Sequence, residues 1–370
     1  MTRSLARAYE LIIFDLDGVV YLDTEAVPGA PAAIRSVVAA GTPVAYATNN
    51  ASRSAAEVAA LLQRLEVPAR PEDVVTSAQA AARKLAEDLP AGARVLVVGS
   101  PALWAEVAAV GLNPVADAGE RPDAVVQGYG PRVGWAELAE ACVAIRAGAR
   151  WVATNTDATL PSPRGPLPGN GSLVAAVRTA LGRGPDVVIG KPGAALFEVA
   201  LANRGVSRAL VVGDRLDTDV EGARRAGLDS LLVLTGVSTA ADLLRAPEHQ
   251  RPTHVAADLS GLSTTDDASR VPDWEADEAR AGGWRVRSVG DRLVLSGAGE
   301  PLDALRALAA AAWANADPAG TSGSKIDSEP RIDSEGEAAA AALRAAFAAS
   351  AGHRGSPSPT PAPTPRPTRS

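Results

Sequence analysis

The sequence predicts an α/β fold built on a doubly wound, mostly parallel sheet, and three observations carry this prediction. Between residues 11 and 262, short aliphatic and β-branched runs alternate with Ala- and Leu-rich stretches whose apolar positions recur every three or four residues. The short runs are continuously apolar, which is typical of parallel strands covered on both faces. Past residue 262 the alternation stops and the chain becomes polar, so we expect the large fold to end there.

The first elements of this fold follow one another closely. Residues 11–14 (Leu-Ile-Ile-Phe) are predicted to form a buried strand, followed by a helix over 32–40, a strand over 43–47 and a helix over 54–65. Helical patterns separate further strands, which are predicted near 74–76, 94–98, 123–126, 151–153, 187–189, 209–213 and 230–234.

The composition excludes several classes of function. With 36 basic and 43 acidic residues the net charge is −7, so we expect neither nucleic acid nor a membrane as a partner. No apolar run is long enough to span a bilayer. The single cysteine, Cys142, excludes an internal disulfide and favours a cytoplasmic location. The three histidines all lie in the last third of the chain, which disfavours a His-based metal site or catalytic dyad.

Asp15 and Asp17 give the strongest chemical signal. They directly follow the strand over 11–14, and side chains two positions apart in extended backbone point to the same side. Gly18 then allows a sharp turn. Because ligands of an open parallel sheet bind beyond the carboxyl ends of its strands, both carboxylates are expected at one site. The alternative is a strand that ends in a solvated acidic turn.

Three further strands end in polar residues of a matching kind. The strand over 43–47 leads into Thr48 and Asn49, the strand over 187–189 into Lys191, and the strand over 209–213 into Asp214 and Asp219. Taken singly, each has an ordinary structural explanation as a helix cap, a surface lysine or an acidic first helical turn. Only three of the 36 basic residues are lysines, which favours a need for a compact ammonium at position 191.

Taken together, these strand ends predict a metal-assisted phosphoryl-transfer site. Four aspartates in one crevice would repel one another unless a cation neutralised them. Oxygen ligands without histidine or thiolate favour Mg²⁺. A carboxylate nucleophile, a second acid, a hard metal, a lysine and a hydroxyl are the groups that phosphoryl transfer requires.

These motifs resemble, in order and spacing, the four motifs of haloacid-dehalogenase-superfamily phosphatases, which have a Rossmann-like core. The matching residues, over roughly 9–262, are Asp15-x-Asp17, Thr48, Lys191 and Gly213-Asp214-x4-Asp219. The resemblance implies that Asp15 is the nucleophile that becomes an aspartyl-phosphate and that Asp17 is the general acid and base. It implies that Thr48 and Lys191 hold the phosphoryl group. It also implies that Mg²⁺ binds the Asp15 carboxylate, the Asp17 carbonyl and Asp214, with Asp219 organising their surroundings.

The spacing of the motifs also predicts an inserted domain. Far more chain separates Thr48 from Lys191 than the roughly 30 residues of a βαβ crossover. We therefore expect a core over 9–73 and 186–262 and an inserted α/β cap over 74–185, which resembles class IIA of the superfamily. A segment close to the pattern of that class contains Asn155 and Asp157 and is expected to face the substrate, although a rigid scaffold loop is the alternative.

Beyond the core we expect a linker over 263–273, a small α+β unit over 274–315 and a low-complexity, largely disordered tail over 316–370. The small unit is predicted to contain strands over 284–289 and 292–296 and a helix over 302–313, and it must dock on something because it is too short to bury a core alone. Some class IIA glycerol-3-phosphate phosphatases carry a short acetyltransferase-like fragment, which this unit resembles in length and pattern.

The resemblance therefore implies a Mg²⁺-dependent phosphomonoester hydrolase for a small phosphorylated metabolite, with glycerol 3-phosphate as the first candidate. Phosphoglycolate, pyridoxal phosphate and nucleoside monophosphates are alternatives, as is a non-catalytic phosphometabolite-binding protein. A further alternative makes the proline-rich tail an interaction module. A homodimer through the cap is compatible with this organisation. The residues expected to contact substrate are Asp17, Thr48, Asn49, Lys191, Asn155 and Asp157.

Overall fold

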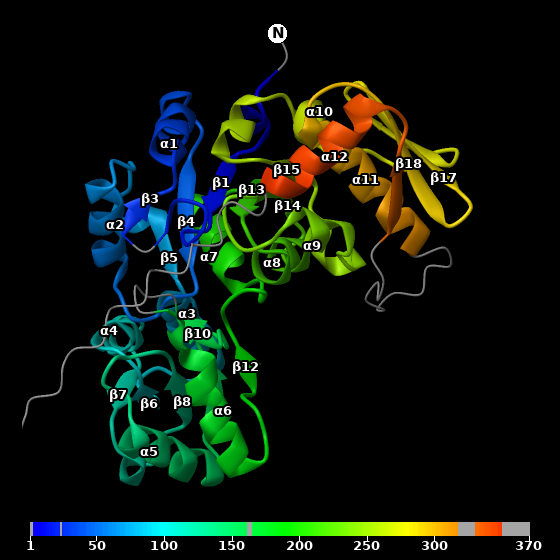
Figure 1. Cartoon of the computed structure of the whole chain (residues 1–370). Helices are drawn as coiled ribbons and strands as arrows, with labels where there is room; N and C mark the ends of the chain where they lie inside the picture. Colours follow the sequence, from blue (N-terminus) through cyan, green and yellow to red (C-terminus); the bar gives the residue numbers. More distant parts are fainter. Residues whose placement is uncertain (1–2, 23, 161–164, 317–329, 350–370) are drawn as a thin grey trace, which may run out of the picture.

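The computed structural model describes residues 3–22, 24–160, 165–316 and 330–349. The chain forms two lobes and a C-terminal unit that lies against the first lobe (Figure 1). Within these ranges, every helix is too short or too polar to cross a membrane.

The first lobe, here called the core, is built on a six-stranded, fully parallel sheet. The strand order is β15-β14-β13-β1-β4-β5, so the chain first builds one side of β1 and later the other. Reversal of direction beside a central strand creates a crevice at the carboxyl ends of β1 and its neighbours. The predicted doubly wound fold is confirmed. The strands are β1 (Leu11–Phe14), β4 (Val44–Thr48), β5 (Val74–Thr76), β13 (Ala209–Gly213), β14 (Asp229–Val233) and β15 (His254–Ala256).

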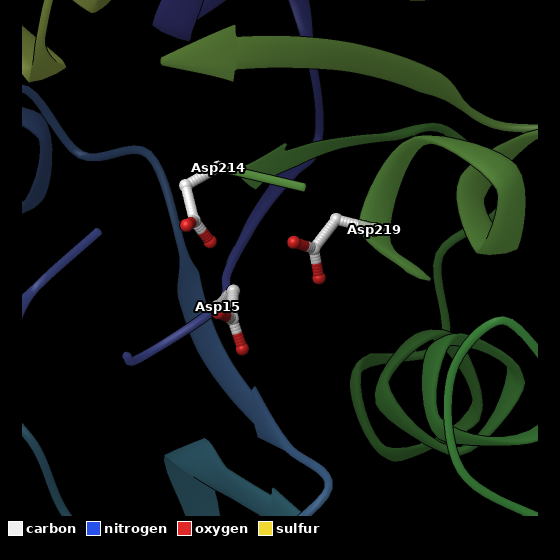
Figure 2. Close-up of side chains that lie close together, drawn as sticks. All are labelled: Asp15, Asp214 and Asp219. Carbon is white, nitrogen blue, oxygen red and sulfur yellow. The ribbon is translucent and has the colours of Figure 1, made fainter. Parts of the chain in front are cut away.

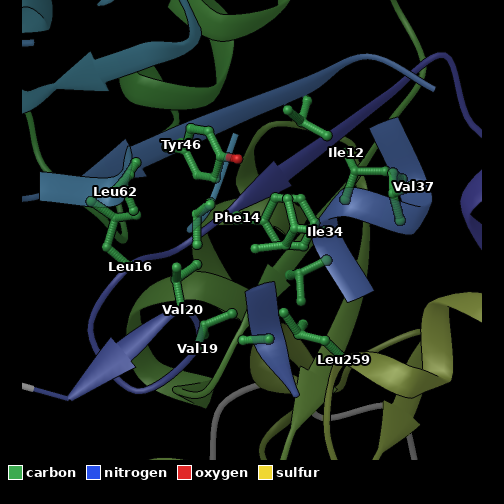
Figure 3. Packing of buried hydrophobic residues seen from close by; sticks show 14 of the residues in the cluster. Ile12, Phe14, Leu16, Val19, Val20, Ile34, Val37, Tyr46, Leu62 and Leu259 are labelled. Carbon is green, nitrogen blue, oxygen red and sulfur yellow. The ribbon is translucent and has the colours of Figure 1, made fainter. Parts of the chain in front are cut away.

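The central strand is buried on both faces, as its continuous apolar run predicts. Ile12 and Phe14 join one hydrophobic cluster, drawn in Figure 3, with residues of helices α1 (Ala30–Ala39) and α2 (Ala55–Arg64). Leu11 and Ile13 join another with residues of α3 (Ser77–Asp88), α7 (Ala195–Arg204) and α8 (Glu221–Arg225). Helices therefore cover both faces and leave the carboxyl edge of the sheet for the site.

The second lobe, here called the cap, contains its own five-stranded parallel sheet in the order β12-β9-β8-β6-β7. Helices α5 (Trp135–Arg146) and α6 (Asn170–Leu181) pack on one face around the buried Trp151. The other face shares one hydrophobic cluster with the core through α3 and α4 (Pro101–Ala109), so the lobes have a common apolar interior. The cap strands are β6 (Arg94–Val98), β7 (Asn113–Val115), β8 (Ala124–Gln127), β9 (Arg150–Ala153) and β12 (Val187–Val188).

Two strands lie in the opposite lobe from the one that the sequence led us to expect. Strand β5, expected in the cap, pairs with β4 and places Val74 opposite Tyr46, so it extends the core sheet. Strand β12, expected in the core, pairs with β9 and places Val187 opposite Val152 at the edge of the cap sheet. Both sheets are parallel and buried, so a short apolar run predicts the strand without predicting which sheet it joins.

The C-terminal unit has a four-stranded sheet in the order β16-β17-β18-β19. Its elements are β16 (Glu278–Ala281), β17 (Trp284–Val289), β18 (Arg292–Gly297), α11 (Pro301–Ala316), β19 (Arg331–Ser334) and α12 (Glu337–Ala349). Strand β19 pairs with β18, and α12 packs on α11. The expectation that the ordered unit ends at 315 is therefore wrong for 330–349. The expected proline-rich extension lies outside the described residues.

This unit docks on the edge of the core sheet. The buried Arg306 of α11 donates to the carbonyl of Val255 in β15 from two nitrogens, at 3.0 and 2.7 Å. Trp313 Nε1 donates to the carbonyl of Leu243 in α9 (Ala240–Leu244) at 2.8 Å. The connection contains a short helix, α10 (Asp266–Ser269). Two small ribbons complete the fold, β2 (Tyr21–Leu22) with β3 (Glu25–Ala26) and β10 (Thr159–Leu160) with β11 (Leu167–Pro168).

Candidate active site

The predicted site residues of the core converge at the carboxyl edge of its sheet. Asp15 follows β1, Thr48 ends β4 and Asp214 follows β13, and these three strands are neighbours in the sheet. Asp214 and Thr48 are buried, while Asp15 is partly accessible. The sheet order alone therefore brings together three motifs that are far apart in the sequence.

Lys191 reaches this edge from the cap. It follows β12, the edge strand of the cap sheet, rather than a strand of the core sheet as expected. Its side chain is 4% exposed, and its ammonium contacts the Asp15 carboxylate and donates to Asp219 Oδ1 at 2.7 Å. Burial opposes the charge of Lys191, but the charges of Asp15 and Asp219 outweigh burial and raise its pKa above the usual value. The lysine is therefore held as a cation between two core carboxylates.

A π-helical turn over Leu216–Val220 returns Asp219 to the end of β13. Asp219 Oδ2 accepts from the main-chain N–H of Arg215 at 3.2 Å, which leaves Oδ1 to Lys191. A Cβ at Gly213 would lie 2.1 Å from that of Asp219, so the close approach requires glycine. The Gly213-Asp214-x4-Asp219 spacing thus corresponds to a compact loop with two inward carboxylates.

Asp15, Asp214 and Asp219 form a cluster of carboxylates (Figure 2). One oxygen from each lies within 4.8 Å of the others. Asp214 Oδ2 accepts from the N–H of Val237 at 2.7 Å, whereas no donor among the described residues bonds the buried Asp214 Oδ1. Burial, and then the charge of Asp219, raise the pKa of Asp214 to about 7. Three mutually repelling carboxylates, of which Asp214 and Asp219 are buried and Asp214 has an unbonded acceptor oxygen, fit a hard divalent cation such as Mg²⁺.

Asp17 and Thr48 flank this cluster. The Asp17 side chain is exposed, and the following Gly18 adopts φ +84°, the left-handed conformation that lets the chain turn directly after the two aspartates. Thr48 Oγ1 accepts from the N–H of Asn50 at 3.1 Å. Asp17 is therefore more open to solvent than Asp15, two residues before it.

The cap loop that contains Asn155 and Asp157 meets the core at Asn49. Asn155 is buried, and its amide donates to the carbonyl of Asn49 at 2.7 Å. Asn49 Nδ2 donates to the Asp157 carboxylate at 3.2 and 3.3 Å. Burial raises the pKa of Asp157, while the hydrogen bond from Asn49 opposes that shift. The amides of Asn49 and Asn155, predicted to contact substrate, are thus engaged by protein groups.

The sequence analysis missed the loop after β14. Val237 and Gly236 close on Asp214, where a Cβ at position 236 would lie 2.0 Å from Asp214 Oδ2. Thr235 Oγ1 donates to the carbonyl of Gly18 at 2.7 Å and so ties this loop to the aspartate turn. A polar residue and a glycine directly after a strand are the same signal that identified the other motifs, and Thr235-Gly236 carries it.

Comparison with known proteins finds hydrolase families and phosphatases, in agreement with the geometry of this site. Residues 12–113 match the model of haloacid dehalogenase-like hydrolases, 188–262 a second hydrolase model of the same kind, and 281–346 a GCN5-related N-acetyltransferase-like domain. The D-glycerol 3-phosphate phosphatase of Mycobacterium tuberculosis is 50% identical over 84% of this chain and 88% of its own length. The 5'-nucleotidase YutF of Bacillus subtilis is 36% identical over 69% of this chain and 97% of its own length.

A solved structure extends the likeness to three dimensions. The glycerol phosphate phosphatase of Mycobacterium tuberculosis in complex with magnesium aligns with a TM-score of 0.84 and 46% identity, over 94% of this chain and 99% of that one. This chain belongs to the haloacid dehalogenase-like hydrolase family. Within it, the chain is a phosphoric monoester hydrolase with the large cap of class IIA, rather than a binding protein that has kept only the fold. Phosphatases of this family use Mg²⁺, which agrees with the predicted cofactor.

Proposed function

We propose that this phosphatase hydrolyses glycerol 3-phosphate. The observation that carries the proposal is the extent of the likeness to a glycerol phosphate phosphatase, which includes the C-terminal unit as well as the core and the cap. The match to the 5'-nucleotidase covers a smaller share of this chain. The favoured substrate is therefore that of the relative with the same three parts.

Asp15 and Asp17 divide the chemistry in this proposal. An oxygen of the Asp15 carboxylate attacks phosphorus, the bond from phosphorus to the glycerol oxygen breaks, and Asp17 protonates that oxygen as it leaves. In the second half, Asp17 removes a proton from water, whose oxygen attacks the aspartyl-phosphate. The bond to Asp15 then breaks and inorganic phosphate leaves. The exposed position of Asp17, two residues from Asp15, supports this division, because a group that exchanges protons with the leaving alcohol and with water must be open to solvent.

The remaining core residues would bind the phosphoryl group and the metal ion. Lys191, which contacts Asp15, and Thr48, at the end of the neighbouring strand, would hold the phosphoryl oxygens. The Asp15 carboxylate, the Asp17 carbonyl and Asp214 would hold Mg²⁺, with Asp219 behind them beside Lys191. When bound, the ion supplies positive charge to the phosphoryl oxygens.

The cap loop supplies the rest of the proposed substrate site. Asp157 is half-buried, and a carboxylate is a suitable acceptor for the hydroxyl groups of glycerol. Asn49 and Asn155 would contribute by holding this loop against the core, through the hydrogen bonds described above. Specificity for a polyol phosphate would thus come from the cap.

We also propose a homodimer through the cap and a cytoplasmic location. Trp135 and Val143 of α5 are 85% and 53% exposed, and two large apolar side chains open to solvent on one helix support an interface on this lobe. A single cysteine supports a reducing compartment.

The test is a comparison of kcat/KM on a panel of phosphomonoesters with the full chain and Mg²⁺. The panel contains both glycerol 3-phosphate enantiomers, phosphoglycolate, pyridoxal phosphate, a nucleoside 5'-monophosphate and p-nitrophenyl phosphate. We expect glycerol 3-phosphate to lead the natural esters and all activity to disappear in EDTA and return with Mg²⁺. A lead by the nucleotide would overturn the substrate, and full activity in EDTA would overturn the metal-assisted mechanism.

A further inference from the structure

Asn49 lies where three parts of the chain meet beside the active site. It follows Thr48 at the carboxyl end of β4, and it contacts the cap loop, the Lys191 segment and the start of α3. Its carbonyl accepts from the Asn155 amide at 2.7 Å and from Ser77 Oγ at 2.5 Å. The main chain of Asn49 is therefore fixed from both lobes, and its side chain is free to act on a third partner.

That third partner is the main chain of Lys191. Asn49 Oδ1 accepts from the N–H of Lys191 at 2.7 Å, and Asn49 Nδ2 donates to the carbonyl of the same residue at 3.2 Å. A Cβ at Gly190 would lie 2.7 Å from Asn49 Oδ1, so the approach depends on glycine at that position. Two hydrogen bonds to one residue fix its position as well as its orientation.

A hydrogen-bonded link between core and lysine is needed because the main chain of Lys191 continues from the cap, whereas its ammonium group contacts residues of the core. It lies three residues beyond the last residue of β12, Val188, whereas its ammonium contacts Asp15 and Asp219 in the core. A small shift of the cap would move the ammonium away from the nucleophile unless a core residue held the lysine backbone. Asn49, at the end of a core strand, does so.

Asp157 reinforces the orientation of the Asn49 amide that the two hydrogen bonds to Lys191 already favour. Both of its carboxylate oxygens lie within 3.3 Å of Asn49 Nδ2, and an ionised carboxylate can only accept. A flipped amide would place Oδ1 against that carboxylate and against the Lys191 carbonyl, and Nδ2 against the Lys191 N–H, so the contacts with all three groups would become repulsive. The cap loop therefore stabilises the same orientation that the Lys191 main chain requires.

We propose that Asn49 is a positioning residue that holds Lys191 against Asp15, and that Asp157 of the cap loop stabilises the orientation of its amide. This inference rests on the proposed function, in which Lys191 must lie beside the nucleophile. It assigns Asn49 to coupling the cap with the catalytic lysine rather than to direct binding of substrate.

The test is an exchange of side chains between positions 49 and 157, assayed with p-nitrophenyl phosphate at saturating Mg²⁺. Asn49→Asp keeps an acceptor for the Lys191 N–H but loses the donor and faces the Asp157 carboxylate. We expect its kcat to fall about 10- to 100-fold with KM changed less than about threefold, because small displacements of a catalytic group are costly. In the double variant Asn49→Asp/Asp157→Asn, the new amide can donate to the new carboxylate. We expect kcat to recover at least about threefold over Asn49→Asp.

Asn50→Asp is the matched control, because it adds the same charge one residue away. The Asn50 Oδ1 acceptor for Ser52 N–H and Oγ, at 2.8 and 2.7 Å, survives that change. We expect its kcat to fall far less than that of Asn49→Asp. Should Asn49→Asp fail to fold, Asp157→Ala provides the second variant, because loss of the orienting carboxylate should lower kcat on this generic ester while Lys191 and Asn49 remain.

The kcat values of these variants test the two parts of the proposal separately. A kcat of Asn49→Asp equal to that of the parent, per folded enzyme, would overturn the positioning role, and an exchange without recovery would overturn the part assigned to Asp157. The parent enzyme separates this proposal from the proposed function. Without Mg²⁺-dependent hydrolysis by the parent the proposed function fails, whereas an active parent with insensitive variants refutes only the coupling.

Discussion

The Lys191 ammonium lies 2.7 Å from Asp219 Oδ1, while it also contacts the carboxylate of Asp15. Asp219 therefore acts on the nucleophile through the lysine. Its other oxygen accepts from the main-chain N–H of Arg215, so both oxygens of this buried carboxylate accept hydrogen bonds. An amide at this position could satisfy only one of the two donors.

From this contact we predict that Asp219→Asn lowers kcat on p-nitrophenyl phosphate by about 10- to 100-fold, because the lysine loses one of the two charges that hold it. Steady-state kinetics at saturating Mg²⁺ measures the effect. Asp217→Asn is the control, since Asp217 is exposed on the same turn and pairs with the Arg215 guanidinium at 2.8 Å. Equal kinetics for the two variants would show that the contact with Lys191 has no catalytic consequence.

A second prediction concerns acid stability and the buried His254 of β15. Burial, and then the charge of Arg270, lower its pKa to about 4, and its ring nitrogens lie 3.1 Å from Ser269 Oγ and 3.3 Å from Tyr9 Oη. The unfolded chain takes up this proton near pH 6.5 and the folded chain only near pH 4, so stability that is complete above about pH 6.5 is lost as the pH falls toward 4.

For this histidine we expect the free energy of unfolding to fall by about 2 kcal/mol between about pH 7 and pH 5. Urea unfolding at the two pH values measures it. His254→Gln should remove this part of the pH dependence, whereas His249→Gln, which changes a more exposed histidine, should retain it. The same pH dependence in His254→Gln as in the parent would refute the assignment.

A third prediction concerns the docking of the C-terminal unit. Arg306→Met removes both donors to the Val255 carbonyl and leaves Asp303 without its partner. An unsatisfied buried acceptor costs about 1–3 kcal/mol, so the thermal midpoint should fall by several degrees. Arg292→Met breaks the exposed pair with Asp333 and should change the midpoint little. A midpoint for Arg306→Met no lower than that of the control would show that this contact does not stabilise the protein.

Much of the core could be predicted from local sequence. The run over 11–14 is a buried central strand, and the capping box of Ser54 and Glu57 begins α2 at the position that the apolar spacing indicated. Strand β15 was missed because it begins with a histidine, whereas the equally short β5 has the β-branched run Val-Val-Thr that predicts a strand. Strand β19 and α12 lie in a repetitive, Ala-rich segment, and they are ordered by packing against β18 and α11, which a local pattern does not reveal.

The sequence predicted those site residues that carry a local signal, and it missed the roles that depend on contacts between distant parts of the chain. Acidic residues directly after strands identified Asp15 and Asp214, since strand ends of a parallel sheet share one edge. The role of Asn49 depends on a hydrogen bond to Lys191, which lies far along the chain, and no spacing reveals it. Thr235 and Gly236 carried the strand-end signal but were passed over, because they act on Gly18 and Asp214 without carrying charge.

The most direct test of the proposed chemistry distinguishes the two aspartates of the first motif. Each variant, Asp15→Asn and Asp17→Asn, is mixed with p-nitrophenyl phosphate and Mg²⁺, quenched in acid and analysed by intact mass spectrometry. Asp15→Asn should carry no phosphate, because an amide is a far poorer nucleophile. Asp17→Asn should accumulate the phosphate adduct, since nitrophenolate leaves without protonation while breakdown lacks its base, which is worth about 10²- to 10⁴-fold. An adduct on Asp15→Asn and none on Asp17→Asn would contradict the assignment of nucleophile and acid.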